Sequence, residues 1–414
     1  MLTTYLKDPL TLERYRSDPA GPHLDAFLDW LEQRGYQPRR IHHLLRGVHR
    51  FSRWAHSTGR TLQALDTTAL EAFRRHLHAC QRLHYPSGRL SHLFVGARHF
   101  VSYLAAVELI APAASVVPQP PEPALLEAFR YWMRTHRGTT EATLTGYRQT
   151  ILALLHTLGE QPEDFDAKTL RAFVLTHAGR GGIGRAKTVV TAVRMFLRFL
   201  IASGRCTPGL DQALPTLAQW RLASLPQYLP AEAVERVLAA CDLMTPIGVR
   251  DHAVLLLLAR LGLRAGDVAA LQWRDIDWQE GTLCVAGKNR RTTRLPLPQE
   301  VGEAILAYVT QQRPRMASEH VFLTAIAPLT PLRPKAVTQL VARALQRAQV
   351  ESPHLGAHVL RHSAATHMLR QGVSLPSIGA LLRHASVETT AHYAKVDITL
   401  LQAVARPWPE VPVC

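Results

Sequence analysis

The C-terminal half of the chain contains an ordered set of cationic and hydrogen-bonding side chains, followed by one tyrosine. The set is Arg264, Lys288, His358, Arg361, His384 and Tyr393. Cleavage of a phosphodiester without a metal ion needs a nucleophile, cations where charge grows on the non-bridging oxygens, and a proton for the leaving oxygen. The set contains a candidate for each role, with the Tyr393 phenol as nucleophile. A phenol has a pKa of about 10, so neighbouring cations must favour the phenolate.

The first arginine of the set, Arg264, follows a turn at Gly262, and Asp267 stands three residues after it. At this spacing a carboxylate can orient a guanidinium. The motif therefore predicts a phosphate-binding arginine with a supporting acid. A surface ion pair is the alternative for this motif on its own.

The lysine of the set lies in a basic turn between two strand-like segments, residues 281–286 and 293–297. The glycine and the polar residues of the turn predict a β-hairpin with Lys288 at its tip. Further candidates for DNA contact in or beside this turn are Arg290, Arg291 and Arg294. The alternative is a turn that binds phosphate without any part in catalysis.

His358 and Arg361 are three residues apart at the predicted start of a helix. This spacing places both on one face, so both can reach one phosphate. An arginine offers the bidentate contact that a lysine does not. We expect His362, the next residue, to support the core, and Gly372 to end this helix.

The composition limits the class of protein. A chain of 414 residues is long enough for two or three domains, and a net charge of +16 points to a polyanion, with nucleic acid as the first hypothesis. A basic protein without such a partner is the alternative. No apolar run is long enough for a transmembrane helix, and the start lacks the plan of a signal peptide. The five scattered cysteines argue against a disulfide framework and a structural zinc site, and fit a reducing cytoplasm.

The first half of the chain contains an internal repeat with an offset of about 100 residues. Residues 24–31 match 126–133, residues 65–73 match 165–173, and residues 100–104 match 196–200. The repeat predicts two tandem modules of about four amphipathic helices each. Two unrelated helical bundles are the alternative. The proline-rich stretch 111–123 predicts an extended linker between the modules, and a looser break precedes residue 227.

Within the first module, residues 41–51 carry an apolar stripe at helical spacing, and cations surround it. The candidates for DNA phosphate contact on this helix are Arg39, Arg40, Arg46 and Arg50. A solvated charged face is the alternative. Asp66 and Asp166 are predicted near the N-caps of matching helices. After residue 227 the pattern predicts a helix-rich domain with a small antiparallel sheet.

In combination, these motifs resemble the tyrosine recombinase family of phage integrases and Xer-type enzymes. The resemblance rests on Gly-Leu-Arg, His-x-Leu-Arg-His and the nine-residue interval from His384 to Tyr393. It implies a mainly α fold, with two tandem helical (SAM-like) core-binding modules followed by an α-rich catalytic domain with a small antiparallel β-sheet. The implied divisions are an N-terminal accessory module at 1–110, a linker at 111–123, a core-binding domain at 124–220, a catalytic domain at 227–404 and a tail at 405–414.

The resemblance also implies a role for each residue of the set. Arg264 and Arg361 would bind the scissile phosphate, Lys288 would protonate the leaving 5′-oxygen, His358 would assist proton transfer, and His384 would complete the site. The family usually has Leu-Gly-His where this chain has Leu382-Arg383-His384. Residues 398–404 would dock on a neighbouring subunit or fold onto their own domain.

The implied function is that of a site-specific DNA recombinase or integrase of a mobile element, acting through a 3′-phosphotyrosyl intermediate without a metal or other cofactor. The implied partners are double-stranded DNA with specific recombination sites and further copies of the chain, as a tetramer on DNA and a monomer or dimer when free. Accessory recombinases are further candidate partners, no membrane is involved, and the expected location is the cytoplasm, at the bacterial nucleoid. The alternatives are a type IB topoisomerase, a hairpin telomere resolvase and a DNA-binding protein without catalysis.

Overall fold

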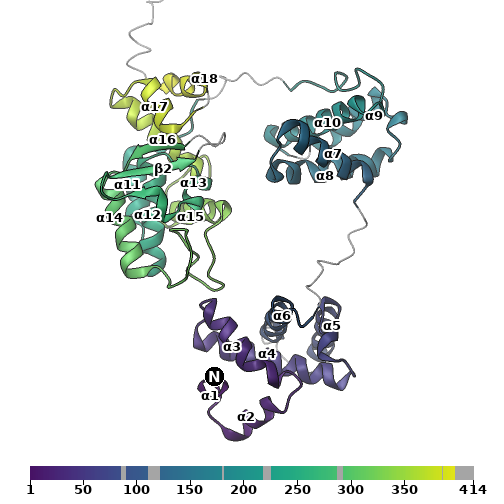
Figure 1. Ribbon diagram of the computed structural model, residues 1–414. Helices are drawn as coiled ribbons and strands as arrows, with labels where there is room; N and C mark the ends of the chain where they lie inside the picture. Colours follow the sequence, from purple (N-terminus) through teal and green to yellow (C-terminus); the bar gives the residue numbers. More distant parts are fainter. Residues whose placement is uncertain are drawn as a thin grey trace, which may run out of the picture. The chain divides into compact units, whose positions relative to one another are not determined.

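The computed structural model describes residues 1–84, 90–110, 122–179, 181–217, 225–286, 292–384 and 386–396 of the chain. These residues are mainly helical, with one small sheet (Figure 1). The chain forms two compact units, one of residues 114–223 and one of residues 1–113 together with 224–414. The larger unit contains separate apolar cores in its N-terminal and C-terminal parts. The fold class predicted from the sequence is confirmed: two helical modules precede an α-rich part with a small antiparallel sheet.

The N-terminal part of the larger unit, here called the first module, is a bundle of helices. They are α1 (Leu2–Tyr5), α2 (Pro9–Arg16), α3 (Leu24–Gln33), α4 (Pro38–Ser57), α5 (Thr67–His84) and α6 (Leu90–Ala106). The predicted apolar stripe of α4 is confirmed, because Ile41, Leu44 and Phe51 are buried. Each module needs such a stripe on every helix, since a short helix is marginal in water without tertiary packing.

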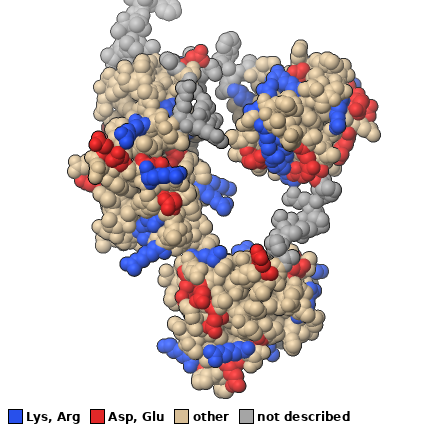
Figure 2. Space-filling view, in the orientation of Figure 1, with Lys and Arg blue, Asp and Glu red and all other residues tan. Residues whose placement is uncertain are grey.

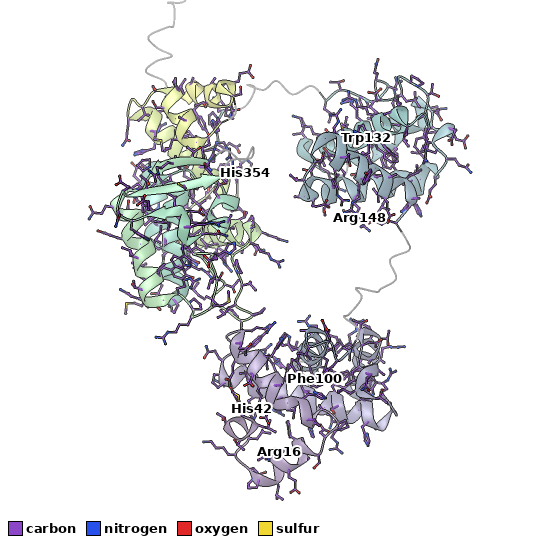
Figure 3. The ribbon with its side chains drawn as sticks, in the orientation of Figure 1. Arg16, His42, Phe100, Trp132, Arg148 and His354 are labelled. Atoms are coloured by element: carbon purple, nitrogen blue, oxygen red, sulfur yellow. The ribbon has the colours of Figure 1, made fainter. Side chains whose placement is uncertain are left out.

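The smaller unit is here called the second module, and its described residues contain four α-helices. They are α7 (Ala124–Arg137), α8 (Glu141–Leu158), α9 (Ala167–Ala178) and α10 (Ile183–Ala202). Its core gathers apolar side chains from all four. In Figure 3, Phe100 marks the interior of the first module and Trp132 lies on α7 of the second.

The two modules contain the same aromatic arrangement at the repeated positions. In the first, the rings of Phe27 and Phe100 meet edge to face at 5.3 Å and 86°. In the second, the rings of Phe129 and Phe196 meet at 5.3 Å and 90°. All four rings are fully buried. The sequence repeat therefore corresponds to a repeated core and not only to a repeated helical period.

The helices that begin with the repeated aspartates have the same N-terminal hydrogen bonds. Asp66 Oδ1 accepts from the Ala69 N–H at 2.9 Å. Asp166 Oδ1 accepts from the Lys168 N–H at 2.6 Å and from the Thr169 N–H at 3.0 Å. These bonds satisfy backbone donors that have no partner within the helix. The predicted N-caps are confirmed.

The C-terminal part of the larger unit consists mainly of α-helices and also contains the small sheet. Its helices are α11 (Ala231–Ala239), α12 (Pro246–Arg260), α13 (Ala265–Ala270), α14 (Gln299–Ala307), α15 (Pro334–Arg347), α16 (Ala357–Arg370), α17 (Leu375–Leu382), α18 (Val387–Ala391) and the 3-10 helix η6 (His392–Val396). Helix α12 is the central one, and residues 253–258 on it are all buried. It begins at Pro246, where the Thr245 hydroxyl accepts a hydrogen bond from the Gly248 N–H at 3.1 Å.

The sheet has three antiparallel strands in the order β1-β2-β3. Strands β2 (Thr282–Ala286) and β3 (Thr292–Pro296) form the predicted hairpin, and β1 (Ile276–Asp277) pairs with the other edge of β2. The tip of the hairpin, residues 287–291, lies outside the described residues, as do most of the predicted linker (111–121) and the segment 398–404. Among the described helices, none has the length and apolar character required to cross a membrane.

Candidate active site

The Tyr393 side chain lies in a small apolar cluster formed by α16, α17 and η6. The other members of the cluster are Ala365, Leu369, Ile378 and Leu382. Tyr393 is 2% exposed, so its ring is fixed by packing and only its hydroxyl reaches polar groups. The Tyr393 Oη atom lies 2.8 Å from the Nδ1 atom of His362. Burial raises the pKa of Tyr393, and the Arg361 charge partly opposes this effect.

Arg361 lies on α16 and is buried, with 4% exposure. Its Nη1 donates to the Gly262 carbonyl and its Nη2 donates to the Leu382 carbonyl. These two bonds hold the guanidinium between the turn before α13 and the end of α17. Burial, followed by the charge of Arg264, lowers the pKa of Arg361 to about 10. The group is still a cation at neutral pH, and it lies in a site with little water, where its charge acts strongly.

Gly262 is required at this turn for two reasons. Its φ of +58° belongs to the left-handed region, where side chains are strained. A Cβ atom here would also lie 2.5 Å from Leu382 Cδ2. Glycine therefore allows the close approach of the Gly262 carbonyl, Arg361 and Leu382. The backbone conformation and the close packing of this turn explain the glycine of the Gly-Leu-Arg motif.

Arg264 occupies the N-cap of α13. Its backbone N–H donates to Asp267 Oδ2 at 2.9 Å, and its Nη2 lies 3.4 Å from the Arg383 carbonyl. The Asp267 carboxylate also forms an ion pair with the Arg383 guanidinium. The expectation that Asp267 orients the Arg264 guanidinium is wrong: the carboxylate binds the Arg264 backbone, because an acid at this position caps the exposed N–H groups of a helix start.

Arg383 has a larger part in the site than its sequence position suggested. It stands at the C-terminus of α17 with φ of +55°, where the family usually has glycine, and its side chain is 5% exposed. The Nε and Nη1 atoms of Arg383 are buried and have no hydrogen-bond partner among the described residues. Through Asp267 this side chain ties the end of α17 to the Arg264 turn.

Two further predicted histidines lie beside Tyr393 and Arg361. His384 Nδ1 lies 2.8 Å from Thr390 Oγ1, and its ring is parallel to the Tyr393 ring at 6.3 Å. Burial lowers the pKa of His384 to about 4, with smaller effects from Arg361 and other cations. Burial, followed by Arg361 and Arg264, also lowers the pKa of His358. Both imidazoles are thus neutral at physiological pH without a bound phosphate.

The structure therefore brings five of the six predicted groups together on α16, η6 and the turns at residues 264 and 384. The sixth, Lys288, lies outside the described residues, as do Arg290 and Arg291. Arg294 is on β3, where it is 60% exposed and its Nη2 lies 3.3 Å from Asp277. The DNA-contact candidates of the first module all lie exposed on α4: Arg39, Arg40, Arg46 and Arg50.

The sequence reasoning missed the position of His362. We expected this residue to support the core, but its Nδ1 contacts the hydroxyl of the candidate nucleophile. One signal pointed to this position: His362 is four residues after His358, so both lie on one face of α16. Nothing in the sequence indicated that Tyr393 would dock on that face.

The comparisons with known proteins agree with this site. Residues 227–399 match the phage integrase family. The predicted integrase/recombinase y4rA of Sinorhizobium fredii is 35% identical over 411 residues, covering 98% of each chain. This chain belongs to the tyrosine recombinases of the phage integrase family. The tyrosine recombinase XerC of Bacillus pumilus is 27% identical to this recombinase. The match covers 66% of the present chain and 92% of the XerC chain.

Solved structures share the fold of the recombinase. A lambda integrase fragment, residues 75–356, bound as a dimer to a COC′ core site has a TM-score of 0.53 at 20% identity, covering 70% of this chain and 98% of that one. XerH in a post-cleavage complex with a palindromic difH substrate has a TM-score of 0.55 at 17% identity, covering 69% and 85%. The recombinase is a DNA-cleaving and DNA-rejoining enzyme of site-specific recombination.

Proposed function

We propose that Tyr393 is the nucleophile of this recombinase and that the enzyme integrates, excises or transposes a mobile element. One observation carries the assignment: the Tyr393 hydroxyl lies 2.8 Å from His362 Nδ1, its ring is parallel to that of His384, and the buried Arg361 charge acts on it. Attack of the Tyr393 oxygen on the scissile phosphorus would leave a 3′-phosphotyrosyl bond and a free 5′-hydroxyl. The energy of the broken ester would remain in the new one, so rejoining would need no ATP.

The other residues of the site would stabilise the transition state. Arg264 and Arg361 would bind the non-bridging oxygens, with Arg361 preorganised by its two carbonyl contacts. The charges of Arg361 and Arg264 both act on His358. His358 would contact the same phosphate and assist proton transfer. Lys288 would protonate the leaving 5′-oxygen. Asp267 and Arg383 would position the Arg264 turn, and His384 would line the phosphate site.

Three separate apolar cores support a division of roles along the chain. We assign residues 227–404 to catalysis, residues 124–220 to the core-binding domain, and residues 1–110 to an additional DNA-binding module. The linker 111–123 would connect the modules, and residues 405–414 would form the tail. The solved lambda integrase tetramer on a Holliday junction, which shares the fold at a TM-score of 0.53, supports a homotetramer on DNA as the working assembly. Accessory recombinases and a nucleoid location belong to the same proposal.

The first module would bind DNA through α4. At 100° per residue, Arg39, Arg46, Arg50 and Arg53 fall on one face of this helix, here called the α4 stripe. It extends over about 21 Å at 1.5 Å per residue. The helix has no acidic residue, and none of the ion pairs found in the described ranges includes a stripe arginine. The stripe would therefore bind backbone phosphates, with Arg40, Arg290, Arg291 and Arg294 as further contacts.

Trapping of covalent protein–DNA adducts in cells tests the proposal, with the wild type and Tyr393→Phe compared and the attached DNA sequenced. We expect adducts only with the wild type, concentrated at a few sequences. Adducts spread over many sequences would instead indicate a type IB topoisomerase. Equal adduct levels for both proteins would exclude Tyr393 as the nucleophile. Phe keeps the packing of the ring in its apolar cluster, so the variant should fold.

A further inference from the structure

The hydroxyl of Tyr393 must lose a proton when its oxygen bonds to phosphorus, and a nearby group must accept this proton. Burial raises the pKa of Tyr393, so the resting side chain is a neutral phenol. A group within hydrogen-bond distance of the oxygen can take the proton during attack. Among the described residues, the imidazole bonded to this oxygen is that of His362, with Nδ1 at 2.8 Å.

The surroundings of His362 keep its imidazole neutral. Burial lowers the pKa of His362 to about 4, and the nearby charged or titratable groups act in the same direction. These groups are His358 and Arg361 on α16, His392 on η6, and His354 before the helix. His384 and Tyr393 also face it. In the neutral tautomer that carries its hydrogen on Nε2, the His362 Nδ1 accepts the phenolic hydrogen, and this is the tautomer that a base toward Tyr393 requires.

We propose that His362 is the general base of this recombinase, so that its Nδ1 receives the Tyr393 proton during cleavage and returns it during rejoining. The proposal rests on the proposed function, in which Tyr393 is the nucleophile. In cleavage, the Tyr393 Oη–P bond forms and the P–O5′ bond breaks. The proton of Tyr393 moves to His362, and the 5′-oxygen takes a separate proton from the acid, assigned above to Lys288. Rejoining reverses each transfer, so atoms and charges balance.

The position of His358 supports this division of labour. Its ring lies 6.2 Å from the His362 ring, and its strongest charged neighbours are Arg361 and Arg264. The charges of Arg361 and Arg264 act on His358, whereas the Nδ1 of His362 lies in hydrogen-bond contact with the candidate nucleophile. A bound phosphodiester is an anion, and it would raise the pKa of the His362 imidazole from its low resting value. Binding of DNA would therefore make the base stronger at the moment when it is needed.

The test uses single-turnover cleavage of a nicked suicide duplex that carries a site recovered from the trapped adducts. The variants are His362→Asn and His362→Ala. Asn places an amide where Nδ1 stands, so it can keep the hydrogen bond to Tyr393 but cannot take a proton. His367→Asn, at an exposed position of the same helix, is the matched control. We expect both His362 variants to cleave about 10²–10⁴-fold more slowly, the usual range for a lost general base, and the control to be unchanged.

Two readouts separate a base from a structural residue. Without a base, the reaction depends on the small phenolate fraction, so the variant rates should rise about tenfold per pH unit from pH 6 to 8. The wild-type rate should rise less steeply, because its imidazole is already unprotonated in this range. A duplex with sulfur in place of the 5′-bridging oxygen needs no proton on its leaving group. It should restore cleavage by Lys288→Ala but not by His362→Asn.

The outcomes distinguish this inference from the proposed function. Wild-type-like rate and pH dependence for His362→Asn, together with an inactive Tyr393→Phe, would overturn the base and leave the nucleophile in place. Rescue of His362→Asn by the sulfur-containing duplex would also overturn it, since the lost group would then be an acid. Adduct formation by Tyr393→Phe would overturn both. A thermal unfolding curve of His362→Asn close to that of the wild type checks that the variant is folded.

Discussion

In the first module, arginines of α4 form an exposed stripe. In the second module, arginines of α7 and α8 form ion pairs with glutamates. The interiors of the two modules are nearly the same, with edge-to-face pairs at Phe27–Phe100 and Phe129–Phe196. The difference therefore lies in surface charge. In Figure 2, blue and red atoms lie side by side on the second module. The two modules thus share a core arrangement and differ in how their surface arginines are paired.

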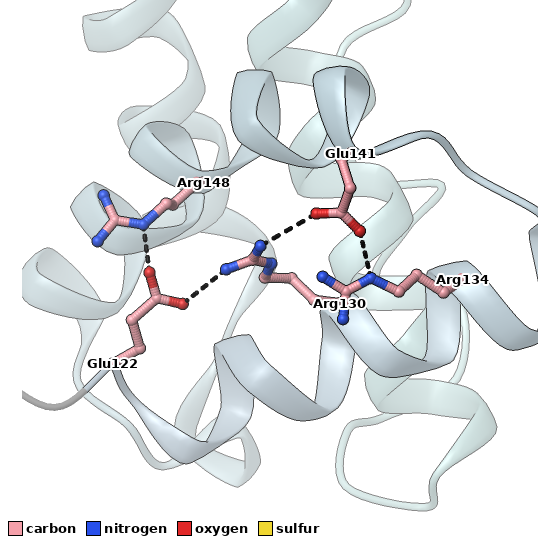
Figure 4. A network of polar contacts seen from close by, with 5 residues as sticks. All are labelled: Glu122, Arg130, Arg134, Glu141 and Arg148. Atoms are coloured by element: carbon pink, nitrogen blue, oxygen red, sulfur yellow. Dashed lines mark hydrogen bonds and ion pairs between the residues drawn. The ribbon is translucent and has the colours of Figure 1, made fainter. Parts of the chain in front are cut away.

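The ion pairs of the second module form a continuous network (Figure 4). Glu122 binds Arg130, with Nη1 to Oε2 at 3.1 Å, and also binds Arg148. Glu141 binds Arg130, with Nη2 to Oε2 at 3.2 Å, and also binds Arg134. Arginines held in this way are less available to DNA phosphates than those of the α4 stripe. The comparison predicts that the first module supplies more of the salt-dependent DNA affinity than the network arginines do.

The largest expected effect tests the shared core. Phe27→Ala and Phe129→Ala should each lower the free energy of unfolding of their own module by about 3–5 kcal/mol, because each leaves a cavity in a buried aromatic cluster. Calorimetry of the full chain should show a different transition displaced in each variant, by a similar amount. A large loss for one and a small loss for the other would show that the two cores are not equivalent.

The second effect tests the difference in charge. Replacing Arg39, Arg46 and Arg50 together by Gln should lower affinity for duplex DNA by roughly tenfold to a hundredfold at moderate salt, and flatten the salt dependence by about 0.9 log units per contact. Fluorescence anisotropy at several salt concentrations measures both. Replacing Lys7, Arg14 and Arg16, exposed residues of the same module, removes the same charge and is the control. Equal losses for the two triple variants would mean that only net charge matters.

A smaller effect concerns the helix crossing in the first module. A Cβ on Gly47 of α4 would lie 2.8 Å from the Cα of Gly96 on α6, so the two helices touch through glycines. Gly47→Ala should destabilise the module by about 1–3 kcal/mol through overpacking. Gly146→Ala in α8 has nothing within 4 Å of the new Cβ, and should stabilise by about 0.5–1 kcal/mol. Thermal unfolding of both variants checks the opposite signs.

The smallest expected effect is the pH dependence of the network. The hydrogen bond from Arg148 lowers the pKa of Glu122, despite an opposing effect of burial. The stabilisation should be present above about pH 4.3, the unfolded value, and should disappear as pH falls through the lower folded value. Glu122→Gln should cost about 1 kcal/mol at pH 7. Glu71→Gln, which breaks the exposed 2.7 Å pair with Arg74 in the first module, should cost less.

If the loss caused by Glu122→Gln were the same at pH 3 and at pH 7, the carboxylate would have no such role. Chemical unfolding of both variants at the two pH values gives the comparison directly.

Much of this fold was readable from the sequence because it depends on local periodicity. The apolar stripe of α4, the capping aspartates and the β2–β3 hairpin each follow from spacing within a short window. The two-residue strand β1 did not, because so short a strand has no period of its own. The repeat also predicted the matched cores, since residues at a nearly constant offset occupy the same place in each bundle.

The order of the candidate catalytic residues was equally readable, but their contacts were not. His362 meets Tyr393 across 31 residues, and Arg383 meets Asp267 across 116. Such pairs depend on how η6 and α17 dock on α16, which is decided by the apolar cluster around the Tyr393 ring. Sequence patterns show which residue types are present. They do not show that a histidine assigned to the core faces the nucleophile.

The anchoring of Arg361 has a consequence for the cell that makes this enzyme. Arg361 binds a carbonyl 99 residues earlier in the chain and another 21 residues later. Contacts between segments so far apart in the chain form slowly, because the entropy of loop closure must be overcome first. A nascent or misfolded copy would thus lack an assembled site. Assembly of the candidate site therefore requires the whole of residues 262–382, because no shorter segment contains both anchors of Arg361.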